Sequence, residues 1–182
     1  MEHHALVQLA LRMGATKATV IPQEKIVLSA EFRKICEGNG CGMYNKTWMC
    51  STAHIGDIDT LMDKVRSYKW ALWYQLIGEI EDSYDFEGMT EVGNRFIAMC
   101  QRVNEELKPV FGKEMLHLGK GGCGLCKRCT ILDNEPCRMP DKALSSLEMY
   151  GVDVYRTTEG TGLKYINGPE TVTYFGMVLF NE

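Results

Sequence analysis

The chain has 182 residues, of which 45% are hydrophobic, and a formal net charge of −4. This length and composition are enough to bury a substantial core, and we expect one domain spanning residues 1–182. The scattered Lys and Arg residues lack the basic excess of nucleic-acid-binding proteins, and no stretch is apolar for long enough to span a bilayer.

The N-terminal half predicts alternating helices and extended segments. Residues 1–18 lack the basic leader, apolar core and cleavage site of a signal peptide, so we expect a cytoplasmic protein. Their apolar periodicity predicts a helix that stops at Gly14. An extended strand over 18–22 and a second extended segment over 25–32 are predicted to follow.

The middle of the chain predicts a loop, a helix, a strand and a long helix. Residues 36–50 are rich in Gly and polar side chains, which is typical of a loop. Asp57 is expected to cap a helix over 57–68. Residues 70–80 favour a central strand, with helix as the alternative, and residues 88–107 show the longest helical periodicity, expected to end at Pro109 and Gly112.

The C-terminal third predicts a short strand over 114–118, a loop over 121–140, a helix over 141–150 and a closing strand over 171–180. This order indicates an α/β or α+β fold, with a small mixed or antiparallel sheet, flanking helices and two cysteine-rich cluster-binding loops, at about 36–50 and 121–140. Because each loop follows an extended segment, we hypothesise that the two loops lie near each other at one end of the sheet.

Four cysteines are crowded into residues 121–140. In a reducing cytosol such thiols indicate metal or redox chemistry rather than disulfides. A triplet at three-residue spacing plus a more distant cysteine is typical of a [4Fe–4S] site. Zinc sites favour separated pairs, so zinc fits less well, and reduced structural thiols are the third alternative. The predicted ligands are Cys123, Cys126, Cys129 and Cys137.

The neighbours of these cysteines support a cluster. Three glycines allow tight turns that leave backbone N–H groups free to bond to cluster sulfur. Basic side chains would offset the negative charge of the thiolates, and two prolines stiffen the turn around the last cysteine. These neighbours are Gly121, Gly122, Gly124, Lys127, Arg128, Pro136 and Pro140.

A second group, Cys36, Cys41 and Cys50, lies in the N-terminal loop and is predicted to hold a second cluster. One iron would then lack a thiolate, so it would be open or take a ligand from elsewhere. His54 and Cys100 are candidates, although His54 is interpreted first as a loop residue and Cys100 as a buried apolar residue of the long helix. The three thiols could also join the other four around one larger centre, or be ordinary loop thiols.

The segments GGCGLCKRC, PCRMP, SSLEMYGVDVYRT and TYFGMVLF resemble a family of small cysteine-rich proteins described as predicted metal-binding proteins of unknown function. The resemblance covers most of the chain and implies metal binding and an origin in anaerobic bacteria or archaea. Ser51 and Thr52 stand where the family often has two prolines, and Met139 stands where it often has His.

Other features have simpler interpretations. Trp70, Trp73 and Tyr74 are expected to pack in the core. Five polar residues beyond the C-terminal loop could form a wall near the metal or a solvated helix end, namely Glu148, Tyr150, Asp153, Tyr155 and Arg156. No P-loop, GxGxxG, HExxH or Ser–His–Asp order is present.

The sequence therefore predicts a cytoplasmic iron–sulfur protein of an anaerobe. It would carry one or two [4Fe–4S] clusters, with two if each cysteine group holds one. It would pass single electrons to a redox partner protein, without a nucleic-acid or membrane partner. One alternative is a redox enzyme that uses a three-cysteine cluster with an open iron. The other is a zinc-stabilised interaction module.

Overall fold

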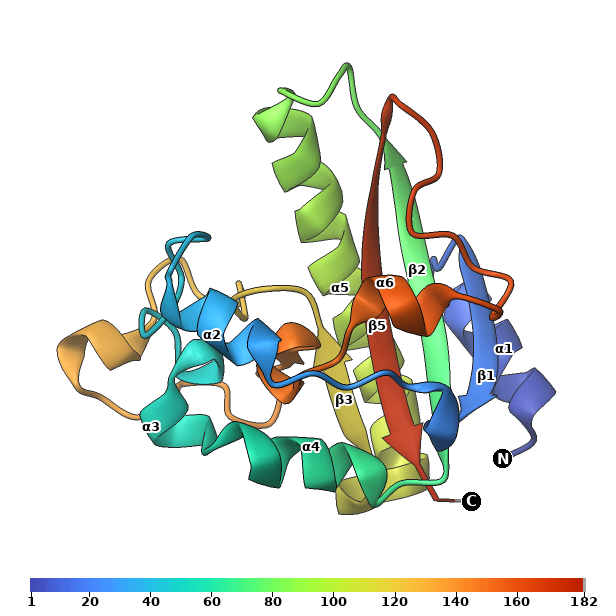
Figure 1. Cartoon of the computed structure of the whole chain (residues 1–182), viewed down its shortest axis with the longest axis horizontal. Coiled ribbons are helices and arrows are strands. Elements are labelled where there is room, and N and C mark those ends of the chain that lie inside the picture. The colour runs from blue at the N-terminus through green and yellow to red at the C-terminus, as the bar shows by residue number, and fades with distance from the viewer. Residues whose placement is uncertain (182) are drawn as a thin grey trace.

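The structure, a computed structural model, describes residues 1–181 and contains a five-stranded mixed sheet flanked by helices (Figure 1). The strand order is β1-β2-β5-β3-β4. All neighbours are antiparallel except β3 and β4, which run parallel. The strands are β1 (Lys17–Pro22), β2 (Trp70–Glu79), β3 (Leu116–Gly119), β4 (Ser145–Ser146) and β5 (Thr171–Phe180).

Strands β2 and β5 form the centre of the sheet. They pair along their full length, from Trp70 opposite Phe180 to Glu79 opposite Thr171. Successive side chains of a strand point to opposite faces, so Trp73 enters the core on one face and Tyr74 the core on the other. The sheet thus has apolar side chains on both faces, and each face needs a covering layer.

Helices cover both faces of the sheet (Figure 1). One face packs against α1 (His3–Arg12) and α5 (Phe86–Phe111), and the other against α4 (Ile58–Arg66) and α6 (Val154–Thr158). The Asp57 carboxylate caps α4 by accepting from the Thr60 N–H at 2.9 Å. No helix within residues 1–181 is long and apolar enough to cross a membrane.

The two remaining helices, α2 (Glu31–Glu37) and α3 (Thr52–Ile55), lie beyond the β3–β4 edge of the sheet. In Figure 1 they occupy the left side of the molecule, together with the irregular segment that follows β3. This side carries all the cysteines outside α5. The sheet therefore serves as the frame from which the two cysteine segments extend.

Most predicted elements are confirmed. The mixed α/β class, the strands around 18–22, 70–80 and 171–180, and the helix capped by Asp57 all agree with the structure. The strand predicted over 114–118 begins two residues later, after a 3₁₀ turn over Gly112–Glu114. The long helix runs through Pro109 to Phe111, because a proline in the last turn removes only one hydrogen bond.

Two predicted elements are wrong. The extended segment over 25–32 forms only an isolated bridge, from Leu28 to Val152, and its end begins α2. The helix predicted over 141–150 is replaced by β4 and a 3₁₀ turn at Glu148–Tyr150. Ser145 and Ser146 are weak helix formers, and pairing with the end of β3 outweighs the local helical pattern.

A buried polar cluster lies under α5. The Tyr74 hydroxyl lies 2.6 Å from His117 Nε2 and 3.2 Å from Cys100 Sγ. Burial lowers the pKa of His117 to about 3 and raises the pKa of Cys100 to about 12, because the low-polarity core disfavours both charged forms. Trp73 and Tyr74 are fully buried, which confirms their predicted core role.

Candidate metal centre

The four C-terminal cysteines line one cavity. After β3 the chain turns through Gly124, whose φ of +69° suits glycine, and then forms a 3₁₀ turn at Thr130–Asp133. The Thr130 hydroxyl donates to the Pro136 carbonyl at 2.9 Å and closes the loop. The resulting cavity has a volume of about 900 Å³, and its walls include Cys123, Cys126, Cys129 and Cys137. We call it the C-terminal cavity.

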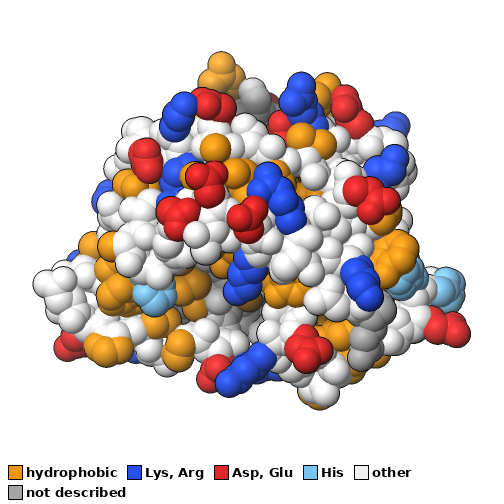
Figure 2. Space-filling model, turned by 60° about the horizontal axis from the view of Figure 1, so that its bottom comes forward, with side chains coloured by type: hydrophobic (Ala, Val, Ile, Leu, Met, Phe, Trp, Pro, Cys, Tyr) orange, Lys and Arg blue, Asp and Glu red, His pale blue; other side chains and the backbone are white. Residues whose placement is uncertain are grey.

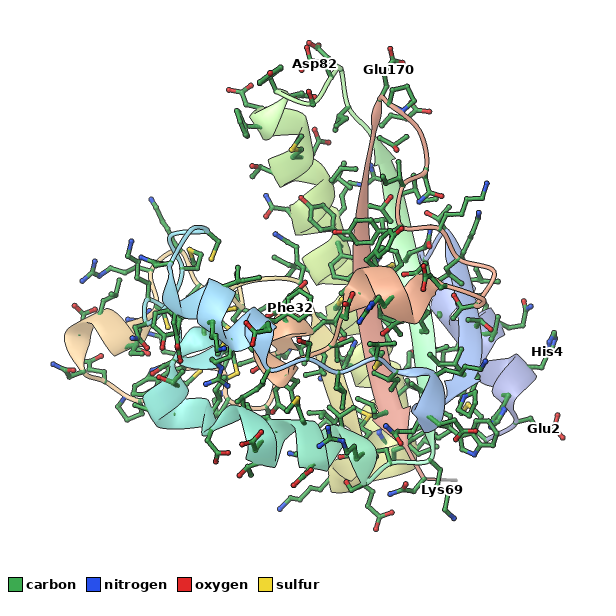
Figure 3. All side chains as sticks on the ribbon, viewed as in Figure 1. Glu2, His4, Phe32, Lys69, Asp82 and Glu170 are labelled. Atoms are coloured by element: carbon green, nitrogen blue, oxygen red, sulfur yellow. The ribbon has the colours of Figure 1, made fainter. Side chains whose placement is uncertain are left out.

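The three N-terminal cysteines line a second cavity, of about 360 Å³, which we call the N-terminal cavity. Cys36 lies in α2 rather than in the predicted loop, Cys41 lies on the exposed turn that follows, and Cys50 ends a 3₁₀ turn at Trp48–Cys50. Much of the remaining wall is apolar and comes from Phe32, Ile35, Tyr44 and Met149. Phe32 on α2 is labelled in Figure 3.

The two cavities adjoin, which confirms the hypothesis that the cysteine segments lie together. Gly121 and Gly122 line the N-terminal cavity, while Cys123, the next residue, lines the C-terminal cavity. The Trp48 side chain lines the C-terminal cavity and donates from Nε1 to the Thr130 hydroxyl and the Glu135 carbonyl, at 3.3 and 3.1 Å. Each cysteine segment therefore helps to build the cavity of the other.

Burial is the main cause of the pKa shifts of the cavity thiols. It raises the pKa values of Cys36, Cys50 and Cys123, because a charged thiolate loses hydration there. Neighbouring thiolates raise these pKa values further. For example, the Cys123 thiolate, which lines the other cavity, raises the pKa of Cys50. Backbone N–H groups of Leu125 and Leu144 donate to the Cys123 sulfur and oppose the rise in its pKa. Metal binding at such thiols would release protons.

Basic side chains surround the C-terminal cavity. Lys46, Lys127, Arg128 and Arg138 all contribute to its walls. Arg128 forms an exposed ion pair with Asp133, with 2.9 Å between Nη2 and Oδ1. Elsewhere charges of both signs are interspersed, and hydrophobic side chains gather at the left end of the molecule (Figure 2). The rim is thus a local basic region on a chain with a net charge of −4.

Neither candidate for the missing N-terminal ligand lines the N-terminal cavity. His54 is exposed, packs edge-on against Trp48 at a ring-centroid distance of 4.9 Å, and borders a separate hollow beside Cys137. Cys100 lies under α5 in the buried cluster with Tyr74. The interpretation of Cys100 as a core residue is confirmed by its burial.

The proposed polar wall beyond the C-terminal loop is not a single surface. Tyr150 is buried in the core, Asp153 caps α6 through the Arg156 N–H at 2.9 Å, and Tyr155 packs against Tyr165. Glu148 alone among the five lines a thiol cavity, and it is the N-terminal one. Sequence reasoning missed this placement, because ninety-eight residues separate Glu148 from Cys50.

All eight cysteines are free thiols. As the side chains stand, no three His, Cys, Asp or Glu residues within 1–181 form a group that could hold a metal ion. The chemistry of the donor set nevertheless fits a sulfur-bound metal, since seven thiols line two adjoining cavities. Thiolates select zinc, copper(I) and iron–sulfur clusters over the hard cations magnesium and calcium.

Comparison with known families gives one match. The family model described as "Predicted metal-binding protein (DUF2284)" matches residues 19–180, which include all seven cavity cysteines. No curated protein and no solved structure matches the chain. The match extends over nearly the whole sequence and agrees with the resemblance drawn from the cysteine segments. The chain belongs to the DUF2284 family of predicted metal-binding proteins.

Proposed function

We propose that this metal-binding protein is a cytoplasmic iron–sulfur protein of an anaerobe that transfers single electrons. Cys123, Cys126, Cys129 and Cys137 would hold a [4Fe–4S] cluster, and Cys36, Cys41 and Cys50 would hold a second. Three cysteines at three-residue spacing plus a remote fourth are the ligand pattern of ferredoxin-type clusters. The observation that carries the proposal is the adjacency of two thiol-lined cavities, which suits two centres in electronic contact.

When bound, such clusters supply reversible one-electron chemistry whose potential depends on burial and on hydrogen bonds to sulfur. This chain provides both influences. The N–H groups of Leu125 and Leu144 donate to the Cys123 sulfur, and Met43, Trp48 and Met49 cover part of the C-terminal cavity. The basic rim would offset the negative charge of the thiolates.

The proposed partner is an acidic redox protein that docks on the basic rim. Lys46, Lys127 and Arg138 lie at the C-terminal cavity, so a negatively charged carrier would be attracted to the cluster site rather than to the rest of this acidic chain. Charge complementarity of this kind mainly speeds association and fixes the orientation of the partner.

Serine variants of single cysteines test the assignment. The anaerobically prepared Cys126→Ser variant should lose or convert the C-terminal cluster and keep the signal of the N-terminal cluster. The Cys41→Ser variant should do the reverse, and Cys100→Ser, outside both cavities, should match the parent protein. Iron content and the electron paramagnetic resonance spectrum after reduction are the measurements. Unchanged iron in Cys126→Ser would remove Cys126 from the ligand set.

A second candidate function is favoured by the N-terminal cavity itself. A hollow of about 360 Å³ with three thiols and a largely apolar wall is large enough for a small molecule. A redox enzyme with an open iron at this site would bind its substrate there. Substrate-sensitive spectra of the N-terminal centre would favour the enzyme, and spectra insensitive to added small ligands would favour electron transfer.

A further inference from the structure

The N-terminal cavity contains three thiols, one fewer than the four irons of a [4Fe–4S] cluster. His54 and Cys100, the two residues that the sequence offered, lie outside this cavity. The remaining question is whether another side chain of the chain faces the three cysteines. A fourth ligand at this site presupposes the proposed iron–sulfur function.

Glu148 faces the same cavity as the three cysteines. Of the described residues that line it, Glu148 is the one with a carboxylate. Cys36, Cys41 and Cys50 line the same hollow, and the Glu148 charge helps to raise the pKa values of Cys36 and Cys50. Carboxylate oxygen is a hard donor, and it binds iron in many protein sites.

The frame around Glu148 fixes the backbone turn that carries it. Ser146 ends β4, where it pairs in parallel with Gly119 at the end of β3. The Ser146 hydroxyl accepts from the Met149 N–H at 3.2 Å, which fixes the start of the turn that carries Glu148. The 3₁₀ turn that begins at Glu148 ends at Gly151, whose φ of +75° suits glycine. The turn therefore holds Glu148 at the wall of the N-terminal cavity, and side-chain rotation would bring its carboxylate to a metal bound there.

Arg33 joins the Cys36 helix to the Glu148 turn. Its guanidinium is buried and donates to the Gly56 and Met149 carbonyls at 3.1 and 3.2 Å, while Nε has no hydrogen-bond partner among the described residues. A buried cation bonded to carbonyl groups is costly unless negative charge lies close by. Three thiolates and one carboxylate around a metal centre would supply that charge.

We propose that Glu148 is the fourth protein ligand of the N-terminal centre, through a carboxylate oxygen, beside Cys36, Cys41 and Cys50. Arg33 is a positioning residue that fixes the two ligand-bearing segments relative to each other. The centre then has protein ligands at every corner, and the fourth is a weaker, oxygen donor.

The test uses the full chain prepared without oxygen, with Glu148→Ala and Glu148→Cys compared with Glu37→Ala. Glu37 follows Cys36 on α2, is exposed and does not line the cavity, so it controls for the loss of one charge. After mild oxidation, Glu148→Ala should lose one iron of the N-terminal cluster and show a [3Fe–4S] resonance. The parent and Glu37→Ala should retain that iron. Glu148→Cys should retain it too, with the shifted spectrum of an all-thiolate cluster.

A parent protein that loses the iron as readily as Glu148→Ala would overturn the ligand assignment, as would a Glu148→Ala variant that behaves like Glu37→Ala. Circular dichroism and a thermal melt of each variant show whether it folds. A second readout uses the metal-free protein titrated with Co²⁺, whose visible spectrum reports its ligands. Glu148→Ala should shift the cobalt bands and Glu37→Ala should not. Absence of labile sulfide in the parent would defeat the iron–sulfur proposal alone, since the cobalt spectra still decide the Glu148 assignment.

Discussion

Trp48 in the N-terminal cysteine segment donates a hydrogen bond to the hydroxyl of Thr130 in the C-terminal cysteine segment, 82 residues later in the chain. Thr130 is buried, and its own hydroxyl donates a hydrogen bond to the carbonyl of Pro136, the residue before Cys137. The two residues thus connect the wall of the C-terminal cavity to the turn that carries its last cysteine. This connection explains how segments distant in sequence form adjoining thiol cavities.

Removing the Thr130 hydroxyl should loosen the two segments. In Thr130→Val the Pro136 carbonyl loses its donor and Trp48 loses one of its two acceptors, so we expect a loss of about 1–3 kcal/mol in the free energy of unfolding. Urea denaturation of the metal-free protein measures this loss. The control is Thr90→Val, in which an exposed hydroxyl that donates to the Phe86 carbonyl is removed. Equal losses in the two variants would contradict a connecting role for Thr130.

The stability of the metal-free protein should fall as the pH drops below about 6.5, because His117 is held neutral in the core. The folded-state pKa of His117 is about 3, below its value of 6.5 in the unfolded chain. The unfolded state therefore binds a proton first, and the stabilisation present above pH 6.5 is lost progressively toward pH 3. Between pH 7 and pH 5 the loss should be about 2 kcal/mol. A His117→Gln variant should show a flatter dependence, and an unchanged slope would mean that His117 is not the titrating group.

Cys100 should resist alkylation in the folded protein. Burial raises its pKa to about 12, so the reactive thiolate stays rare throughout the range from pH 7 to about pH 9. Exposed Cys41 should react first in the metal-free protein, as followed by iodoacetamide labelling and mass spectrometry. Cys100 should become labelled only when denaturant unfolds the chain. Rapid labelling of Cys100 at pH 8 without denaturant would contradict the packing under α5.

Charge reversal on the basic rim should slow the docking of an acidic electron carrier. With a plant-type ferredoxin as probe, we expect Lys46→Glu combined with Lys127→Glu to lower the association rate about tenfold at low salt. The difference should vanish at high salt, where exposed charges are screened. The matched control reverses Lys17 and Lys25, which lie at the β1 side of the sheet. If both pairs of substitutions slowed association equally, the cause would be the net charge of the chain, and the basic rim would not be a docking site.

Local patterns predicted the elements that local forces determine. Alternating apolar residues defined the strand that became β5, and the Asp57 cap with a 3.6-residue period defined α4. The segment 141–150 was predicted wrongly because its structure depends on a partner outside it. Ser145 and Ser146 pair with Leu118 and Gly119, and no feature of the segment itself shows that pairing.

Part of the candidate site could also be predicted from local sequence, and part depends on tertiary packing. Cysteine spacing identified both thiol groups, since each group is contained in a short segment. The placement of Glu148 beside Cys36 and Cys50 depends on how α2 packs against the 3₁₀ turn at Glu148–Tyr150, and one sequence contains no signal for that contact. In the structure, buried Arg33 of α2 donates a hydrogen bond to the Met149 carbonyl and so joins α2 to this turn.

The most direct test of the iron–sulfur proposal is the content of iron, acid-labile sulfide and zinc per chain in protein purified without oxygen. Two [4Fe–4S] clusters predict about eight irons and about eight sulfides per chain. Zinc at the thiols without labile sulfide would contradict the proposal and indicate a metal-stabilised binding protein.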